Sequence, residues 1–332
     1  MTLLKYTLWR VLQTVPVLIG IATITFFLTN AMPGDPVDIM IGADVDESLE
    51  AALRERYGLD RPTHERYVIY LMNVAQGDFG LSIHYGAPVI DKIFERLPVT
   101  MLLVGSAYTF GLTLAIPLGV LSAARRNRGV DHISRVIALF GVSTPSFWIG
   151  LLLIIVFSFH LGWFPSSDLV RPWRGPAAVS GAETWLEVWY LSARSLVLPT
   201  IALGTLQMAA ATRIERSSMI ETLQTDYVKL ARGYGVSERT ILRRHAFRPA
   251  QLPVITIVGL NVSTALGGSV LIETVFNING MGRLIITGIQ TLDYPLIMGT
   301  TLFFGLIFLI GVIITDISYA YVDPRISYGD RE

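Results

Sequence analysis

Long apolar runs without charged residues alternate along this chain with shorter charged stretches. Six segments contain no Asp, Glu, Lys or Arg over a length sufficient to cross a hydrocarbon core of about 30 Å, which takes about 20 helical residues. The shortest is 195–212, where Arg194 and Arg213 at the two ends can reach the polar boundary. The pattern predicts an all-α polytopic membrane protein with six transmembrane helices, in segments 11–34, 97–124, 136–167, 195–212, 249–272 and 294–315.

The first apolar run can be interpreted as a cleaved signal peptide or as a retained anchor, because Lys5 and Arg10 precede it. Its apolar part is longer than the roughly 7–15 residues of a signal-peptide core, and no A-x-A-like cleavage site stands at Asn30-Ala31-Met32. We therefore expect residues 1–31 to remain as a cytoplasmic end and a first transmembrane helix.

Residues 32–97 form a sizeable polar region between the first two predicted spans, too long for a plain connector. We expect helices at 47–57, closed by Gly58, and at 63–74, followed by a turn at 77–80. This extracytoplasmic region is interpreted as a cap over the helix bundle, and also as a docking surface for a soluble partner. The remaining residues, 98–332, form a five-helix core with spans that begin at Pro98 and at Leu198-Pro199.

Composition and loop charge agree with this pattern and orient it. Charged residues make up 16% of the chain, whereas a soluble domain carries about 25%. With the N-terminus inside, the inner segments hold 16 of the 26 Lys and Arg residues. The bias of basic residues toward cytoplasmic loops places both termini, and a long loop at 213–253, in the cytoplasm.

The cytoplasmic loop contains a short amphipathic pattern between two apolar runs. Tyr227, Leu230, Ala231 and Tyr234 recur at i, i+3, i+4 and i+7, which predicts one face of a helix. Gly235 ends it, because glycine takes the left-handed conformation without steric penalty. We expect Ser237 to cap a second helix, with Glu238 in its first turn, that ends at Pro249. The rigid exposed element that results predicts a docking partner.

Two polar features lie within the predicted spans. Ser143-Thr144-Pro145-Ser146 forms a polar patch within the third span and is explained equally well by helix packing and by a pathway lining. A stripe of polar and small residues runs along the fifth span. Polar residues in lipid cost free energy unless they face protein or a water-filled cavity. We interpret that stripe as a candidate translocation path, with helix packing as the alternative; its residues are Asn261, Ser263, Thr264, Gly267, Gly268, Ser269 and Glu273.

Turn signals separate the last two spans. Residues 277–283 are expected to form a glycine-bearing turn, and Asp293-Tyr294-Pro295 to begin the last span.

Several kinds of chemistry are absent from the sequence. No lysine follows a glycine, which excludes the phosphate-binding pattern G-x-x-x-x-G-K-[ST]. The histidines form no H-x-x-x-H pair, and there is no cysteine, so we expect neither a metal site nor a resident cofactor. A serine nucleophile at Ser269 would lack a histidine at the same depth. We therefore expect a protein without catalytic residues.

The cytoplasmic loop resembles the signature of permease subunits of ATP-binding-cassette (ABC) importers, E-A-A-x-x-x-G, in Ala231 and Gly235. It departs from this general form at Lys229-Leu230. The variant of the dipeptide and oligopeptide branch fits better. It is present as Asp226-Tyr227-Val228, Ala231-Arg232, Gly235, Arg244-His245-Ala246, Arg248 and Leu252-Pro253.

Further motifs follow in the order typical of that branch's first permease subunit, so the resemblance covers the whole chain. They are Met32-Pro33-Gly34-Asp35-Pro36, Thr144-Pro145-Ser146-Phe147, Ile272-Glu273-Thr274-Val275-Phe276, Gly280-Met281-Gly282-Arg283, Asp293-Tyr294-Pro295 and Asp323-Pro324-Arg325.

The resemblance implies a type I ABC importer permease fold in the inner membrane of a prokaryote. It implies a second homologous permease, two cytoplasmic ATPase subunits that bind ATP and Mg, an extracytoplasmic solute-binding protein and surrounding lipid as partners, and no nucleic acid. The residues that it implies for coupling to the ATPase are Tyr227, Lys229, Leu230, Ala231, Arg232, Tyr234, Gly235, Arg244 and His245.

Several functions remain open at this point. The branch implies import of di- or oligopeptides, but its members also take nickel chelates, glutathione or short oligosaccharides. An ion-coupled secondary transporter is the rival class, although no internal repeat is evident. A non-transporting membrane scaffold is a third interpretation.

Overall fold

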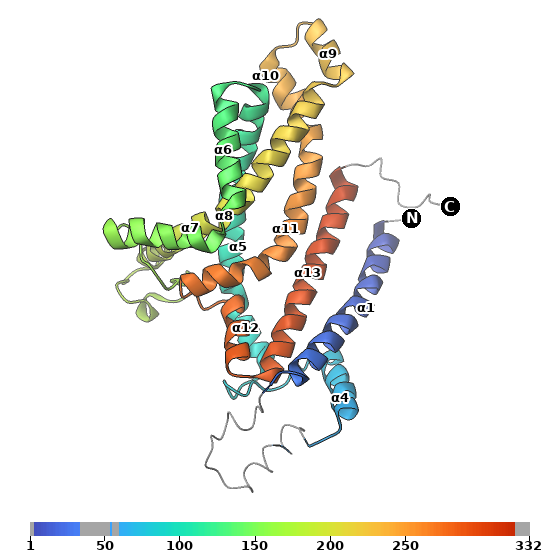
Figure 1. Ribbon diagram of the computed structural model, residues 1–332, viewed down its shortest axis with the longest axis vertical. Coiled ribbons are helices and arrows are strands. Elements are labelled where there is room, and N and C mark those ends of the chain that lie inside the picture. Colours follow the sequence, from blue (N-terminus) through green and yellow to red (C-terminus); the bar gives the residue numbers. More distant parts are fainter. Residues whose placement is uncertain (1–2, 34–53, 55–59, 323–332) are drawn as a thin grey trace. The chain divides into compact units, whose positions relative to one another are not determined.

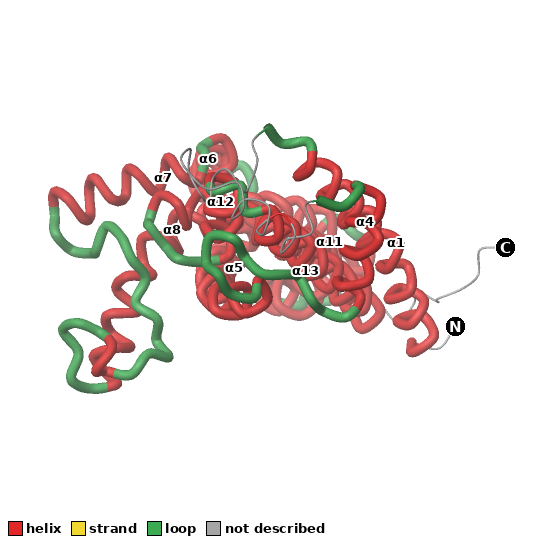
Figure 2. The backbone as a smooth tube through the Cα atoms, turned by 90° about the horizontal axis from the view of Figure 1, so that it is seen from below, coloured by secondary structure: helices red, strands yellow, loops and turns green. Residues whose placement is uncertain are grey.

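A computed structural model describes residues 3–33, 54 and 60–322, with all their side chains except those of 3–6, 260, 262–268 and 316–322. In this part of the chain the regular structure is helical, as Figures 1 and 2 show, apart from one isolated β-bridge between Leu81 and Pro88. The predicted all-α class is confirmed. The expected helix 47–57 and the motif at 323–325 lie outside the described residues.

Four described helices are long and apolar enough to cross a membrane, and a bent pair of helices brings this to five. The four contain the stretches Thr7–Asn30, Val89–Ala124, Trp185–Leu223 and Tyr294–Thr315. Helix α11 (Phe247–Val275) occupies the fifth predicted segment but is not among them. The expectation of six spans is therefore not confirmed, while a multi-span helical membrane protein is.

The third predicted span is broken rather than continuous. Helix α6 (Gly129–Ser143) ends at Thr144, and α7 (Ser146–Leu153) with the π-helical turn Ile154–His160 continues at an angle of 102° to it. Thr144 is extended, at φ −98° and ψ 127°, because a residue before proline is pushed out of the helical region. The polar patch is therefore the bend itself, visible in Figure 1 where α7 leaves the end of α6 sideways.

Two helices begin earlier than the prolines that were expected to start them. Helix α5 (Val89–Ala124) and helix α8 (Trp185–Leu223) carry Pro98 and Pro199 in their interiors, so both starting points were wrong. A capping box opens α8, where the Thr184 hydroxyl accepts from the Glu187 amide and the Glu187 carboxylate accepts from the Thr184 amide. Such reciprocal bonds set a helix start more strongly than a proline that a membrane helix tolerates.

The described residues group into two compact units. The first takes in residues up to Thr100 and Asn279–Ile313, and the second Met101–Ile278 and residues from Ile314 onward. In the first unit, helix α4 (Thr63–Ala75), which matches the expected 63–74, packs on α1 (Leu3–Asn30). The Tyr70 ring stacks on Phe26 with centroids 5.6 Å apart, which ties the polar region to the first helix.

Asp293 organises the start of helix α13 (Tyr294–Val322) within the first unit. Its buried carboxylate accepts from the Leu296 amide at 3.1 Å, as a helix cap, and also from the Ser82 hydroxyl and the His84 amide. The predicted beginning of the last span is thus confirmed. The expected turn at 277–283 was too long, because α12 (Met281–Gln290) already begins within it.

In the second unit, small residues let α5 and α8 approach closely. A Cβ on Gly111 would meet the Gly204 carbonyl oxygen at 3.0 Å, and one on Gly204 would meet the Ala107 carbonyl oxygen at 2.7 Å. Backbones that pack this closely are typical of helices in lipid. The small residues of the second span therefore serve packing at Gly111, whereas a Cβ on Gly105 would meet no atom of another part of the chain within 4 Å.

Candidate functional sites

Helix α9 (Asp226–Gly233) is the amphipathic helix that the sequence predicts, and Gly235 ends it as expected. Gly235 has φ +75°. The Val236 amide donates to the Ala231 carbonyl at 3.1 Å, and the Gly235 amide to the Arg232 carbonyl at 2.9 Å. This pair of bonds is the Schellman motif, which satisfies carbonyls left free at a helix end.

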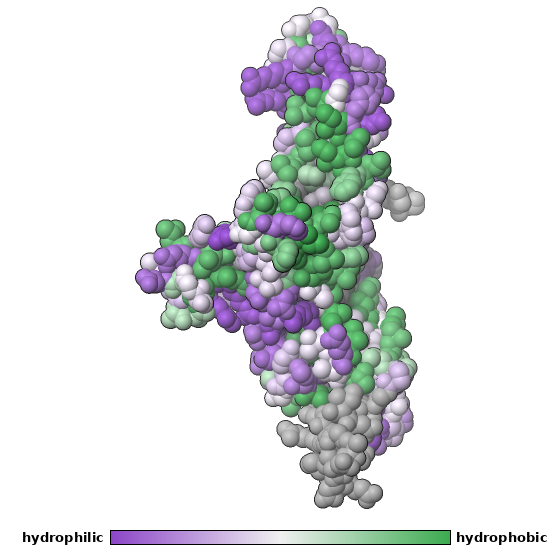
Figure 3. All heavy atoms as spheres, turned by 60° about the vertical axis from the view of Figure 1, so that its left-hand side comes forward, coloured by the Kyte–Doolittle hydropathy of each residue, from purple (hydrophilic) through white to green (hydrophobic). Residues whose placement is uncertain are grey.

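The predicted apolar face of α9 is open to the surroundings. Tyr227, Leu230 and Tyr234 are 46%, 60% and 80% exposed, while Ala231 is half-buried. On the opposite side Val228 is fully buried, a contact that the sequence interpretation missed. The helix is thus anchored through Val228 and presents three large side chains outward. Figure 3 shows a hydrophilic surface over α9 and α10, above a band of apolar side chains.

Several charged residues of this segment are engaged inside the chain. Arg232 binds Glu238 through two nitrogens, at 2.7 and 3.3 Å, and this holds the pKa of the Glu238 carboxyl below its usual range. Lys229 donates to Asp226 at 2.9 Å, which lowers the pKa of the Asp226 carboxyl. The Tyr227 hydroxyl donates to the His245 carbonyl at 3.2 Å. The bonds of Arg232 and Tyr227 join α9 to the segment that follows it, whereas the Lys229–Asp226 pair lies within α9.

The second helix of the loop differs from the expectation. Helix α10 (Glu238–Thr240) passes through the π-helical turn Ile241–Ala246 directly into α11, so the helix does not end at Pro249. Pro249 has no N–H to donate to the His245 carbonyl four residues earlier, and that carbonyl accepts from the Tyr227 hydroxyl. Ser237 stands at the capping position, but its hydroxyl bonds the Thr240 hydroxyl at 2.9 Å rather than a backbone amide. The exposed Arg244 and half-buried His245 lie on the π-helical turn.

A buried ion pair below this loop was missed by the sequence interpretation. The Asp131 carboxylate, fully buried at the start of α6, binds two nitrogens of Arg216 on α8 at 2.6 and 2.9 Å. It also accepts from the Ser122 hydroxyl at 2.7 Å and from the Asn127 amide at 2.9 Å. One carboxylate therefore joins the ends of α5, α6 and α8. The hint in the sequence is a lone acid among loop arginines, but its partner lies 85 residues away.

A second buried carboxylate links α8 to α11. Glu215 is fully buried, and the Gln251 side-chain amide donates to both its oxygens, at 2.9 and 2.8 Å. Desolvation makes such a group expensive without partners. With Met219, Ala246 and Ala250 packed beside it, this link gives the exposed loop a stiff base.

The candidate path residues all lie on α11. Ser269 and Glu273 are fully buried, and the Ser269 hydroxyl donates to Glu273 at 3.2 Å. Asn261 is half-buried, and the side chains of Ser263 and Thr264 fall outside those described, as do the surroundings of Gly267 and Gly268. Within the described part of the stripe, the structure brings Ser269 and Glu273 together. Among the described residues, no group of three His, Asp or Glu side chains could hold a metal ion.

Comparison with known families decides what kind of protein this is. The family described as "Binding-protein-dependent transport system inner membrane component" matches residues 115–328, and its N-terminal companion, "Binding-prot-dependent transport system membrane comp, N-term", matches residues 3–104. The chain belongs to this family of ABC importer permeases. As a permease subunit of the family it has no nucleotide-binding domain and no cofactor of its own, and works with ATPase and binding-protein partners in the inner membrane.

Curated relatives of this permease align over almost their whole length. The oligopeptide transport system permease protein AppB of Bacillus subtilis (strain 168) is 39% identical, over 97% of this chain and 99% of its own. The dipeptide transport system permease protein DppB of Alkalihalophilus pseudofirmus is 35% identical over 98% and 100%. The glutathione transport system permease protein GsiC of Escherichia coli (strain K12) is 34% identical over 98% and 100%.

Among solved structures, a chain of the MetNI methionine ABC transporter in inward-facing form aligns with a TM-score of 0.49 at 16% identity. The alignment covers 70% of this permease and 96% of that chain.

Proposed function

We propose that this permease is the first membrane subunit of an ATP-driven importer of di- or oligopeptides, with α9 as its coupling helix. Two relatives named for oligopeptide and dipeptide transport align end to end with it and support this substrate class. In the proposed orientation both termini and α9 face the cytoplasm. A second permease completes the path, two ATPases drive it, and an extracytoplasmic binding protein delivers the substrate.

The observation that carries the coupling role is the exposed face of α9 on its fixed base. Tyr227, Leu230 and Tyr234 are exposed on a helix that is anchored through the buried Val228 and through the bond from the Tyr227 hydroxyl to the His245 carbonyl, which is the arrangement of a knob that fits a groove. Closure of the ATPases on ATP would move such a knob as a rigid element and switch the helices behind it between two arrangements. Residues Lys229, Arg232, Arg244 and His245 support the knob or flank it.

The coupling role is tested with Leu230→Asp and Tyr227→Asp in the reconstituted importer. We expect ATP-dependent uptake to fall about tenfold or more, because an acid replaces an apolar anchor in a desolvated contact, while the complex still inserts in the membrane. Gln224→Asp is the control, since it adds the same charge at an exposed position just before α9. Unchanged uptake in both Asp variants of α9 would refute the assignment.

The rival class and the rival substrates need separate measurements. Uptake that follows an ion gradient without ATP would indicate a secondary transporter. A glutathione transport relative makes glutathione the second candidate substrate, ahead of nickel chelates and short oligosaccharides. Binding of each ligand class to the partner binding protein, measured by calorimetry, discriminates among them, and tight binding of short peptides is the expected result.

The path assignment rests on the polar residues of α11, from Asn261 to Glu273. We propose that substrate passes along this helix between the two permeases. Asn261→Leu is expected to reduce uptake while it leaves basal ATP hydrolysis intact. Normal transport in this variant would remove Asn261 from the path.

A further inference from the structure

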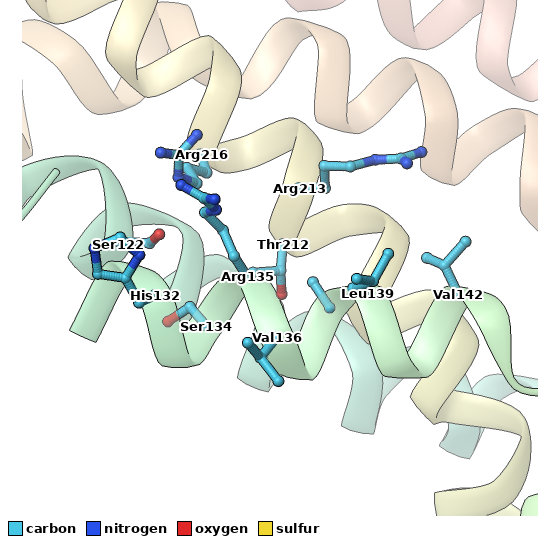
Figure 4. Close-up of a pocket in the computed structure, with 11 residues that line it drawn as sticks. Ser122, His132, Ser134, Arg135, Val136, Leu139, Val142, Thr212, Arg213 and Arg216 are labelled. Atoms are coloured by element: carbon cyan, nitrogen blue, oxygen red, sulfur yellow. The ribbon is translucent and has the colours of Figure 1, made fainter. Parts of the chain in front are cut away.

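A pocket lies between α6 and α8, on the part of α8 that leads to the coupling loop. Its volume is about 420 Å³. Figure 4 shows Arg135 and Arg216 together toward one end, aliphatic groups along α6, and the Arg213 side chain extending away from the other two arginines. The lining residues are Ser122, His132, Ser134, Arg135, Val136, Ala138, Leu139, Val142, Thr212, Arg213 and Arg216.

The charge in this pocket is unbalanced. Arg135, Arg213 and Arg216 line it, and the buried Asp131 nearby is already bound by two nitrogens of Arg216. Among the described residues, no ion pair or hydrogen bond engages the side chain of Arg135 or of Arg213. Figure 4 shows Arg135 extending from α6 toward the side where Arg216 lies. Guanidinium groups gathered around a cavity favour an anion with several acceptor oxygens.

A buried hydroxyl provides an independent sign of a missing polar ligand. Thr212 is only 4% exposed and lines the pocket, yet its hydroxyl oxygen has no hydrogen-bond partner within the described residues. Buried polar groups are nearly always paired, so an orphan that borders a cavity points to a ligand that pairs with it. The hydroxyl can donate to an anionic oxygen held by the arginines.

The other part of the lining is apolar and faces outward. Val136, Leu139 and Val142 follow one side of α6 and are 66%, 69% and 38% exposed. Their spacing of three residues makes a continuous aliphatic strip that leads away from the basic end. A free phosphate ion would leave this strip uncovered, whereas a molecule with an anionic head and a hydrocarbon tail matches both parts.

We propose that this pocket is a binding site for an anionic phospholipid. The lipid phosphate is held by Arg135, beside Arg216, and by the Thr212 hydroxyl, and an acyl chain lies along Val136 and Leu139. Basic pockets between membrane helices on the cytoplasmic side fit this class of ligand. The site lies beside the Asp131–Arg216 ion pair that joins α5, α6 and α8, so the lipid would brace the base of the coupling loop.

The test is a lipid titration of the assembled transporter, delipidated in mild detergent and followed by native mass spectrometry. Phosphatidylglycerol and phosphatidylcholine with identical acyl chains are compared. We expect a preference for phosphatidylglycerol that falls roughly five-fold for Arg135→Gln. Thr212→Val is expected to weaken phosphatidylglycerol binding without lowering the thermal stability of the lipid-free complex, because it removes an unpaired hydroxyl.

The matched control is Arg126→Gln, which removes an exposed positive charge from the neighbouring loop but not from the pocket. It should leave the lipid preference unchanged. An equal loss in Arg126→Gln, or displacement of phosphatidylglycerol by millimolar inorganic phosphate, would overturn the proposal in favour of general electrostatics or a simple anion site. A preference found in the isolated chain but absent from the assembled transporter would mean that a partner subunit covers the pocket, which also overturns it.

Discussion

Replacement of Gly235 tests why the coupling loop needs glycine after α9. The residue is required either for its left-handed backbone conformation or for the absence of a side chain. Nothing lies within 4 Å of the position that a Cβ would take, so a side chain meets no steric obstacle. The cost comes from φ, which is +75°. Left-handed backbone costs an L-residue about 1–2 kcal/mol, less for Asn and more for a β-branched residue.

The expected order of coupled transport is therefore Gly, Asn, Ala and then Val. For Gly235→Ala, a penalty of about 1–2 kcal/mol lowers the population of the native turn relative to its unwound form about five- to thirty-fold. The Schellman bonds to Ala231 and Arg232 are then lost, and α9 is free to reorient. The measurement is ATP-driven uptake per ATP hydrolysed in proteoliposomes, with insertion checked for each variant.

The most direct test of this reasoning compares coupled transport in Gly235→Asn and Gly235→Ala. Asn is the larger side chain but the better left-handed residue. If Gly235→Ala transports better than Gly235→Asn, side-chain size at a partner surface governs the position and the argument from φ is wrong. If Gly235→Val couples as well as the wild type, the turn has no role in transmission.

Three further predictions concern stability and pH. Asp131→Asn leaves its arginine partner on α8 without a counter-charge. Since that arginine side chain is 21% exposed, we expect a loss of stability of about 2–3 kcal/mol, below the roughly 3–5 kcal/mol typical of broken buried pairs, seen as a lower Tm. Asp226→Asn, at a carboxylate 97% exposed, should change Tm little. Tyr70→Phe should leave Tm unchanged or raise it, because the buried Tyr70 hydroxyl, whose pKa burial raises to about 12, has no hydrogen-bond partner among the described residues; a marked loss would mean that the hydroxyl is engaged. The Arg232–Glu238 bond lowers the pKa of the Glu238 carboxyl, so the bond is complete above the usual Glu range and is lost only as pH falls through the lowered pKa. Coupled transport should therefore be constant from about pH 6 to 8. A sharp decline within that window would mean that this bond does not support coupling.

Local features of the loop could be predicted because their causes are local. The face of Tyr227, Leu230 and Tyr234 follows from helical spacing, and the left-handed Gly235 from the identity of one residue. The start of α13 at Asp293 could be predicted for the same reason, since a capping side chain acts within three residues.

Features that depend on distant partners could not be predicted. The pairing of Asp131 with Arg216 spans 85 residues, and nothing near either residue specifies it. Prolines led to wrong predictions of helix continuity and of helix starts. Pro145 bends its segment because Thr144 is extended, while Pro199 sits inside α8 because a capping box further back already fixes the helix start. One residue type thus marks a break or an interior position according to what surrounds it.

The positive charge of the coupling loop divides into two sets with different roles. Lys229 and Arg232 are bound to carboxylates of the loop itself. The Lys229 pair lies within α9, and the Arg232 pair joins this eight-residue helix, far shorter than one that is stable alone, to the segment after it. Arg239, Arg243 and Arg244 are exposed, and no ion pair within the described residues engages them.

The charges available to a partner therefore lie on α10 and the π-helical turn, beside the apolar face of α9 rather than on it. An acidic rim on the partner would meet the arginines while its apolar groove receives Leu230 and Tyr234. Because exposed charges act mainly on encounter and register, the apolar face must carry most of the affinity. If α9 is the coupling helix, as we propose, the Arg232–Glu238 pair and the Tyr227–His245 bond would transmit its movement toward α11.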